Sequence, residues 1–357
     1  MLRTEVPLKH YKITRPFKPK AWIKTMIYSI FTFISFTALM NYLINPYDVF
    51  SHHFLSSFIT KKNHPISSRM TKFYQAVQKH PVTIMMGTSR MGMFSIQQVD
   101  KYVPGPIYNM SMPGSTIEEQ IAYMNYMIKY ENTSHIILGL DFFSFNPDKV
   151  NASSFSYNRL TPTLLVNDDI KTSLFSFQTT KNSFKTIQDN IHLHKKNNQD
   201  WRFIKLSEDE IRQKTNNQIL QYKTSKEFLK NKKFHDPKSI EHNMQLFQKF
   251  ISSNKNIKFH VYLSPVSKPM LNLYKEMNLD NTFLLWKKRL QETLSFVDFC
   301  TNNSITSNQK NFRDASHVNP QIGDLIFAKL FQDNSISIPQ DFGNYLEKKT
   351  SNEYNTL

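Results

Sequence analysis

Twenty consecutive residues, 25–44, carry no charged side chain and read TMIYSIFTFISFTALMNYLI. A helix rises about 1.5 Å per residue, so one of this length spans the hydrocarbon core of a bilayer. The stretch therefore predicts one transmembrane helix, although its Ser, Thr and Asn residues lower its hydropathy. A cleaved signal peptide is the nearest alternative, but no Ala-x-Ala site follows. A buried helix of a soluble protein is the other alternative, disfavoured by the length of the stretch.

Seven Lys and Arg residues lie in the first 24 positions, against the single acidic residue Glu5. Basic residues before an apolar span tend to stay in the cytoplasm, which predicts a basic cytoplasmic arm at 1–24 and a main domain on the other side of the membrane. This arm supplies a net +6 of the formal charge of +17. Because topology explains the arm and no recognition motif accompanies the remaining charge, we expect no nucleic-acid partner.

The amino-acid composition indicates a folded protein with no intramolecular disulfide and no zinc site. The 357 residues are 39% hydrophobic and include 29 Phe, which is enough to bury a core. The single cysteine, Cys300, cannot close an intramolecular disulfide, and no Cys/His cluster offers a zinc site, so no metal is expected.

Glycine is scarce, yet five of the seven fall between 87 and 139. Glycine suits positive φ and close backbone approach, so this region is predicted to hold tight turns and the functional site.

Short apolar runs alternate with helical periodicity along the chain. Strands are predicted at 82–86, 107–110, 135–140, 257–263 and 296–299. Thr116 and Glu119 have the spacing of a capping box ahead of a helix, and Asn319-Pro320 is predicted to open the last helix. A further helix is expected at 281–294. The alternation predicts an α/β fold with a parallel sheet covered by helices on both faces.

Beyond the arm and the span, the chain divides into a connector, a domain and a tail. The connector at 45–79 leads into the α/β domain at 80–332, and a polar, loose tail follows at 333–357. The segment 150–255 is rich in Lys, Asn, Gln, Ser and Thr and breaks the alternation. It has candidate helices near 168–194, 206–231 and 237–253 and no convincing strand, which indicates a helical insertion or, alternatively, a separate helical domain.

Ser89 lies two residues after a glycine, at the carboxyl end of the first predicted strand, where ligands of open α/β sheets bind. Far downstream, Asp314 precedes His317 by three residues, immediately before the last helix. An Asp so placed can orient the imidazole that a serine nucleophile needs as its base. Each motif alone is also compatible with an ordinary turn or cap.

Taken together, these blocks resemble the SGNH (GDSL-like) hydrolase and acyltransferase superfamily. Ser89 matches its serine, Gly114 its second-block glycine, Gly139 and Asp141 its third block, and Asp314 with His317 its last block. The resemblance covers about 80–145 and 255–332 and implies a flavodoxin-like three-layer fold. With its anchor and the NPYDVF stretch, the chain is most similar to membrane-tethered envelope members, namely relatives of the alginate O-acetylation proteins and of the D-alanyl-lipoteichoic acid factor.

Asp141 departs from the family pattern, which has an Asn that helps to hold the oxyanion. An ionised Asp has only acceptors and would repel the developing negative charge. Either Asp141 points away and backbone N–H groups of Ser89 and Gly114, with Asn109 or Asn146, complete the oxyanion hole, or the site does not perform hydrolysis. Arg90 is a candidate contact for an anionic substrate, or a residue that only adjusts the site's electrostatics.

The resemblance implies an esterase or O-acyltransferase on the outer side of the bacterial inner (cytoplasmic) membrane. Its substrate would be an envelope glycan or lipid-linked polymer, with a membrane acyl-donating protein as a candidate partner. Ser89 would attack the acyl carbonyl, His317 would carry the proton and Asp314 would orient His317, with no cofactor. The alternative is a catalytically silent protein of this fold that binds glycan or a membrane partner.

Overall fold

The computed structural model describes residues 19–52, 54, 68–161, 166–193, 201–224 and 234–349. Most of the predicted basic arm and the last residues of the predicted tail therefore lie outside the described residues.

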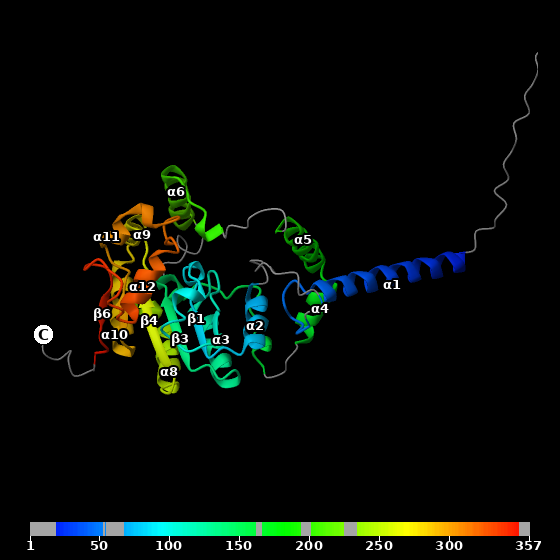
Figure 1. Ribbon diagram of the computed structural model, residues 1–357, viewed down its shortest axis with the longest axis horizontal. Helices are drawn as coiled ribbons and strands as arrows, with labels where there is room; N and C mark the ends of the chain where they lie inside the picture. The colour runs from blue at the N-terminus through cyan, green and yellow to red at the C-terminus, as the bar shows by residue number, and fades with distance from the viewer. Residues whose placement is uncertain are drawn as a thin grey trace, which may run out of the picture.

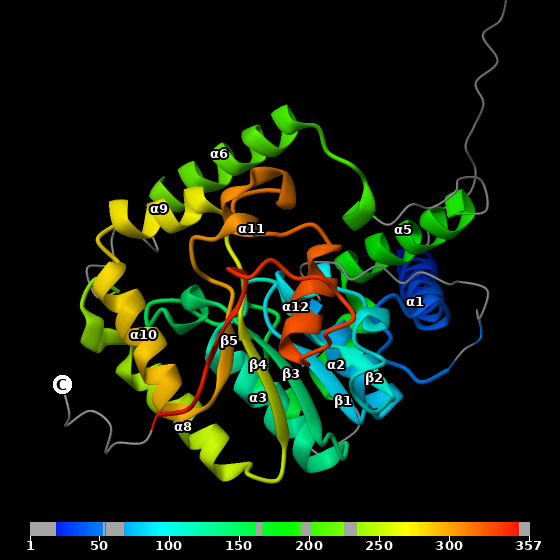
Figure 2. The ribbon, with the colours of Figure 1, turned by 60° about the vertical axis from the view of Figure 1, so that its left-hand side comes forward.

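A six-stranded sheet forms the centre of the molecule (Figures 1 and 2). Its strands are β1 (Thr83–Met86), β2 (Ile107–Asn109), β3 (His135–Leu140), β4 (Lys258–Leu263), β5 (Phe296–Asp298) and β6 (Asn344–Leu346). They run in the order β2-β1-β3-β4-β5-β6, and only the β5–β6 pairing is antiparallel. The predicted α/β fold with a parallel sheet is confirmed. The first five strands have the 2-1-3-4-5 order of doubly wound sheets.

Successive residues of each strand point to opposite faces of the sheet, and both faces are buried. The apolar cluster on one face contains Ile84, Met86, Ile136, Leu138, Leu140, Val261, Leu263 and Phe296. The cluster on the other face contains residues that alternate with these along the strands, namely Met85, Ile137, Tyr262 and Val297. Burial on both faces explains why these strands are continuous apolar runs in the sequence.

Helices cover the two faces and make three layers (Figure 2). The first apolar cluster includes side chains of α2 (Ser68–Lys79), α3 (Ile117–Tyr130), α8 (Glu241–Ser253), α9 (Lys268–Glu276) and α10 (Asp280–Thr293). The second includes Ile326 and Phe327 of α12 (Ile322–Leu330), and the Phe327 ring contacts that of Phe94 with centroids 5.3 Å apart.

The predicted capping box at the start of α3 forms only in part. Thr116 Oγ1 accepts the Glu119 N–H at 3.1 Å, as expected. The Glu119 carboxylate, however, pairs with the buried guanidinium of Arg69 in α2, 2.7 Å away, so it does not reach back to the cap. The last helix also begins slightly later than predicted, at Ile322, after a turn in which the Ile322 N–H bonds to the Asn319 carbonyl.

The segment 150–255 contributes helices to three places. It contains α4 (Asn167–Phe175), α5 (Phe177–Leu193), α6 (Glu208–Thr224) and α8, and no strand within its described part. Helices α4 and α5 pack against α1, and α6 packs against α9 and the short helix at Gln309–Asn311 (Figure 1). Helix α8 packs beside the sheet on α3 and α10.

The predicted loose tail is in part ordered. Residues 333–349 return along the sheet, where Phe342 is completely buried against Phe299, with ring centroids 4.6 Å apart. Strand β6 then pairs with β5, and a short helix α11 (Ser304–Ser307) donates hydrogen bonds to Asp341. The segment is polar as predicted, but backbone pairing and one buried ring hold it in place.

Helix α1 (Pro19–Ile44) projects from the domain (Figure 1). Within it, Lys20–Ile44 is long and apolar enough to cross a membrane. Eight of its large apolar side chains are more than half exposed: Trp22, Ile27, Tyr28, Ile30, Phe31, Phe33, Phe36 and Leu39. A helix that is apolar all round and uncovered by protein is typical of a membrane span.

Candidate active site

Ser89 lies in the turn that follows β1, at the carboxyl edge of the sheet. The order of strands reverses between β1 and β3, and crevices at such switch points are where open α/β sheets bind ligands. The preceding Gly87 is required by close packing, because a Cβ there would lie 2.8 Å from the Gly139 carbonyl oxygen of β3. The turn is held by a hydrogen bond from the Gly92 N–H to the Thr88 carbonyl.

Three of the predicted residues, from opposite ends of the domain, meet at this turn. Ser89 Oγ lies 2.8 Å from His317 Nε2. On the other side of the ring, His317 Nδ1 lies 2.9 and 2.8 Å from the two carboxylate oxygens of Asp314. The carboxylate can only accept, so Nδ1 carries the proton and Nε2 is free to accept the serine hydroxyl. Nucleophile, base and orienting carboxylate thus stand in hydrogen-bonded sequence.

Asp314 is held by its own loop. Its Oδ1 accepts the backbone N–H groups of Ser316 and His317, at 2.8 and 2.9 Å. Burial acts to raise the pKa of Asp314, but the hydrogen bonds and charge of His317, with the two backbone donors, outweigh burial and lower the pKa below its ordinary value. Asp314 is therefore an ionised acceptor for His317 at neutral pH.

Contacts from both sides fix the loop that carries Asp314 and His317. After β4, the Ser267 hydroxyl donates to the Ala315 carbonyl at 2.7 Å. From α6, Gln218 Nε2 donates to the Ser316 hydroxyl at 2.9 Å. The segment 150–255 thus contacts the residue next to His317 directly.

Ser89 and His317 open into a cleft of about 800 Å³. Five cationic side chains line it: Lys72, Lys79, Arg202, Lys214 and Arg313. Asp314 is the only carboxylate among its described lining residues, and it is engaged by His317. Burial, together with the charge of Arg202, lowers the pKa of Lys72 to about 8. A cleft of this charge favours anionic ligands.

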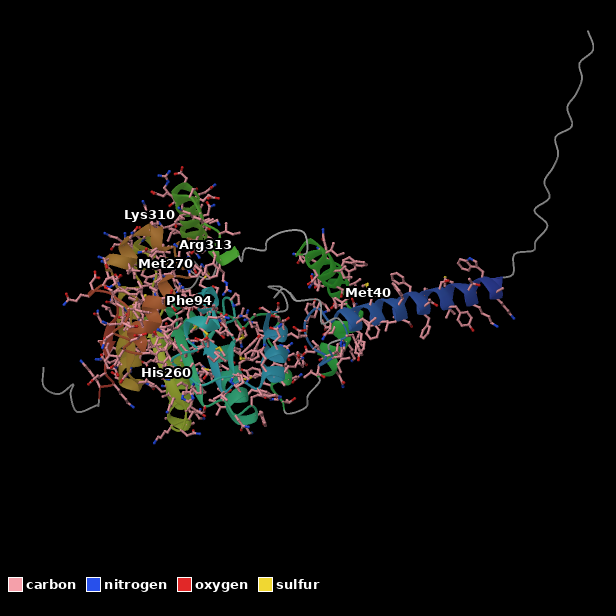
Figure 3. All side chains as sticks on the ribbon, in the orientation of Figure 1. Met40, Phe94, His260, Met270, Lys310 and Arg313 are labelled. Atoms are coloured by element: carbon pink, nitrogen blue, oxygen red, sulfur yellow. The ribbon has the colours of Figure 1, made fainter. Side chains whose placement is uncertain are left out.

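Two of the cleft cations also support its wall. Arg313, labelled in Figure 3, donates from Nη1 to the carbonyls of Arg202 and Ile204, both at 2.9 Å. Arg202 in turn donates from Nη1 to the carbonyls of Gly92 and Phe94, both at 3.2 Å. The segment before α6 is thereby joined to the turn that carries Ser89.

The structure does not support the substrate-contacting role considered for Arg90. Its guanidinium is buried and lies 2.6 Å from Asp141 Oδ1, and neither residue lines the cleft. Burial acts to lower the pKa of Arg90, but the charge of Asp141 outweighs it and raises the pKa above its ordinary value. Asp141 also accepts the Thr88 hydroxyl. Of the two alternatives for Asp141, the carboxylate points away from the cleft and joins the ends of β1 and β3.

The other oxyanion candidates are differently engaged. Asn109 lines the cleft, but its side-chain NH₂ donates to the carbonyls of Met91 and Phe94, at 3.2 and 2.9 Å, so it is not the donor proposed. Gly114 has a φ of +62°, which suits glycine, but it is not among the cleft-lining residues. The buried Asn146 does not line the cleft either. The Ser89 N–H has no acceptor among the described residues.

Sequence reasoning missed the cleft cations and Gln218. Arg313 has a local signal, since it adjoins Asp314 in the chain. Lys72 lies in α2, Arg202 in the short helix Trp201–Phe203 and Lys214 in α6, so only tertiary packing brings them to the site. No group of three or more His, Cys, Asp or Glu side chains that could hold a metal occurs in the described part of the chain.

Comparisons with protein-family models, with curated proteins and with solved structures found no match to this chain. What it does must therefore be inferred from the arrangement of Ser89, His317 and Asp314 and from the cleft beside them.

Proposed function

We propose that the protein is a serine esterase or O-acyltransferase of the SGNH type. The observation that carries this proposal is the hydrogen-bonded sequence Ser89–His317–Asp314 at the edge of a cleft. Ser89 Oγ is 2.8 Å from the imidazole nitrogen that would take its proton, within the range needed for general-base activation.

In the first half-reaction, Ser89 Oγ attacks the carbonyl carbon of an acyl ester while His317 Nε2 takes the hydroxyl proton. The bond from the acyl carbon to the alkoxy oxygen then breaks, and His317 returns its proton to the departing alcohol. The acyl group is left on Ser89. In the second half-reaction, His317 deprotonates water, for hydrolysis, or a hydroxyl of the acceptor, for transfer, and Ser89 is regenerated.

The negative charge that develops on the carbonyl oxygen needs donors. The Ser89 N–H is the candidate on this chain, because it belongs to the nucleophile itself and has no acceptor among the described residues. A side-chain donor is missing from the third block, where Asp141 is engaged by Arg90 and Thr88. This observation favours a second candidate function, a catalytically silent fold that binds glycan or a membrane partner.

Helix α1 supports a location for the protein, and the charge of the cleft supports a class of substrate. The apolar helix α1 and the basic residues before it are consistent with a single span in the bacterial inner membrane, with the N-terminus inside and the main domain outside. The cationic cleft suits an anionic envelope glycan or lipid-linked polymer. For acyl transfer, a membrane protein would donate the acyl group.

A serine-directed fluorophosphonate tests the chemistry on the full chain in detergent. The wild type should be labelled at Ser89, and Ser89→Ala should abolish labelling. Ser95→Ala is the matched control, since Ser95 also lines the cleft and should leave labelling unchanged. Failure of the wild type to label, with folding intact, would favour the silent protein.

A further inference from the structure

Helix α5 has its polarity reversed relative to a helix of a water-soluble domain. The face that packs against the protein is polar, with five residues at most 3% exposed: Thr179, Asn182, Ser183, Thr186 and Asn190. The opposite face carries large apolar side chains, with Phe177 84% exposed, Phe184 59% and Ile191 52%. These three recur every seven residues, so they lie along one stripe of the helix.

Hydrogen bonds hold the polar face in this orientation. Asn41, near the end of α1, donates to the Leu174 carbonyl and to Thr180 Oγ1, at 2.8 and 3.1 Å. The same Asn41 accepts the Ser183 hydroxyl at 2.8 Å. Asn182 donates to the Tyr47 hydroxyl at 2.8 Å. A rotation of α5 that buried its apolar stripe would break these bonds, so the exposure of the stripe follows from the packing.

We propose that the apolar stripe of α5 lies in the membrane interface, with its axis along the bilayer surface. The occupant of the stripe is lipid, because α5 contacts the end of α1 that is itself exposed and apolar, with Leu39 55% and Leu43 38% exposed. Lipid around the end of α1 is thus adjacent to α5. Figures 1 and 2 show α5 running across the end of α1, not alongside it.

The charged side chains beside the apolar stripe are consistent with a position in the membrane interface. Lys181 and Lys185 are exposed on one flank of the stripe, where they can reach anionic headgroups. Two lysines within 17 residues also make α5 too polar to cross the bilayer as a second span. Phe175, at the end of α4, is 57% exposed and extends the apolar surface.

A membrane-depth measurement on the full chain tests this. Cys300 is buried and its thiol pKa is raised to about 12, so a cysteine introduced at the surface can be labelled selectively. The variants Phe184→Cys and Ile191→Cys would carry an NBD fluorophore in vesicles of phosphatidylcholine and phosphatidylglycerol. The matched control is Leu220→Cys on α6, an apolar position that is 60% exposed and far from α1 in Figure 1.

We expect lipids with a nitroxide on the acyl chain to quench the probes at 184 and 191 several-fold more than the probe at 220. The two α5 probes should lie about 5–10 Å into the headgroup and acyl boundary. Equal, weak quenching at all three positions would overturn the proposal. So would energy transfer between labelled copies at position 184 without lipid quenching, because a second copy would then cover the stripe.

Discussion

Arg90 Nη1 lies 2.6 Å from Asp141 Oδ1, and this buried ion pair joins the turn after β1 to the end of β3. Ser89 is the residue before Arg90, so the pair holds the backbone that carries the nucleophile. Under the proposed function Asp141 would stand at the position of a side-chain oxyanion donor, yet its carboxylate pairs with Arg90 and serves the fold.

Asp141→Asn is therefore expected to destabilise the protein, not to activate it. The change leaves the Arg90 guanidinium buried without its counter-charge, which typically costs about 3–5 kcal/mol. Chemical denaturation should show this loss in the free energy of unfolding. The control is Glu208→Gln, which likewise converts a carboxylate to an amide but in the exposed ion pair with Lys310. This variant should leave the free energy of unfolding unchanged. Higher esterase activity in Asp141→Asn would contradict this assignment.

Ser89→Ala and His317→Ala should each abolish turnover of an activated ester while leaving the fold intact. Because nucleophile and base act as one unit, the double variant should be little slower than either single variant. Steady-state kinetics on all three, with circular dichroism for folding, checks this. Small, additive losses would instead indicate a binding site.

Gln218→Ala should slow the reaction without changing the nucleophile. It removes the hydrogen bond from α6 to Ser316, next to His317, and such a bond is worth about 1 kcal/mol, or about a fivefold loss in kcat. Asn217→Ala, an exposed neighbour on the same helix, is the control. Equal rates in the two variants would mean that α6 does not position the loop.

His260 should make stability depend on pH in mildly acidic solution. Burial, with the charges of His135 and Lys258, lowers the pKa of this β4 residue (Figure 3) from 6.5 to about 4. Below about pH 6.5 the unfolded chain binds a proton that the folded protein does not bind until about pH 4. The free energy of unfolding should therefore fall as the pH decreases from about 6.5 to about 4.

His260→Phe should flatten this part of the pH profile, measured by denaturation at several pH values. His242→Gln, on the exposed side of α8, serves as the control and should retain the wild-type slope. An unchanged slope in His260→Phe would assign the pH dependence to other groups.

A reporter that works only outside the cytoplasm, fused after Leu357, tests topology and should be active. Replacing residues 1–44 with a cleavable signal should remove the integral anchor, so that the domain, held at most peripherally through α5, becomes extractable by carbonate. Extraction of the full-length protein by carbonate would exclude a transmembrane α1.

Much of the fold is predictable because the strands are buried on both faces. The residues of β1 and β3 are apolar almost without interruption, and four of the seven glycines lie in the segment between these two strands. Strand β6 carries no such signal, since Asn344 and Tyr345 are exposed and the pairing with β5 depends on the backbone. An edge strand of three residues leaves little pattern in a sequence.

The serine, aspartate and histidine are predictable because each follows a strand or precedes a helix in a recognisable order. The partner of Asp141 is not, because Arg90 lies 51 positions away and either charge could have faced solvent. The partner of Glu119 is not predictable either. Its spacing from Thr116 is that of a capping box, but its carboxylate accepts a hydrogen bond from Arg69. Long-range pairing of charges depends on tertiary packing, which local spacing does not encode.

The antiparallel strand β6 also covers the β5 side of the sheet against pairing with other chains. It occupies the backbone N–H and C=O groups of β5, which would otherwise form an open edge that other chains could extend. The residues just after it include Glu347, Lys348 and Lys349, charges that discourage further pairing. Under the proposed topology β6 is the last strand to cross the membrane, so the sheet keeps an unpaired edge at β5 until residues 344–346 have been translocated, and truncation before residue 340 should promote aggregation.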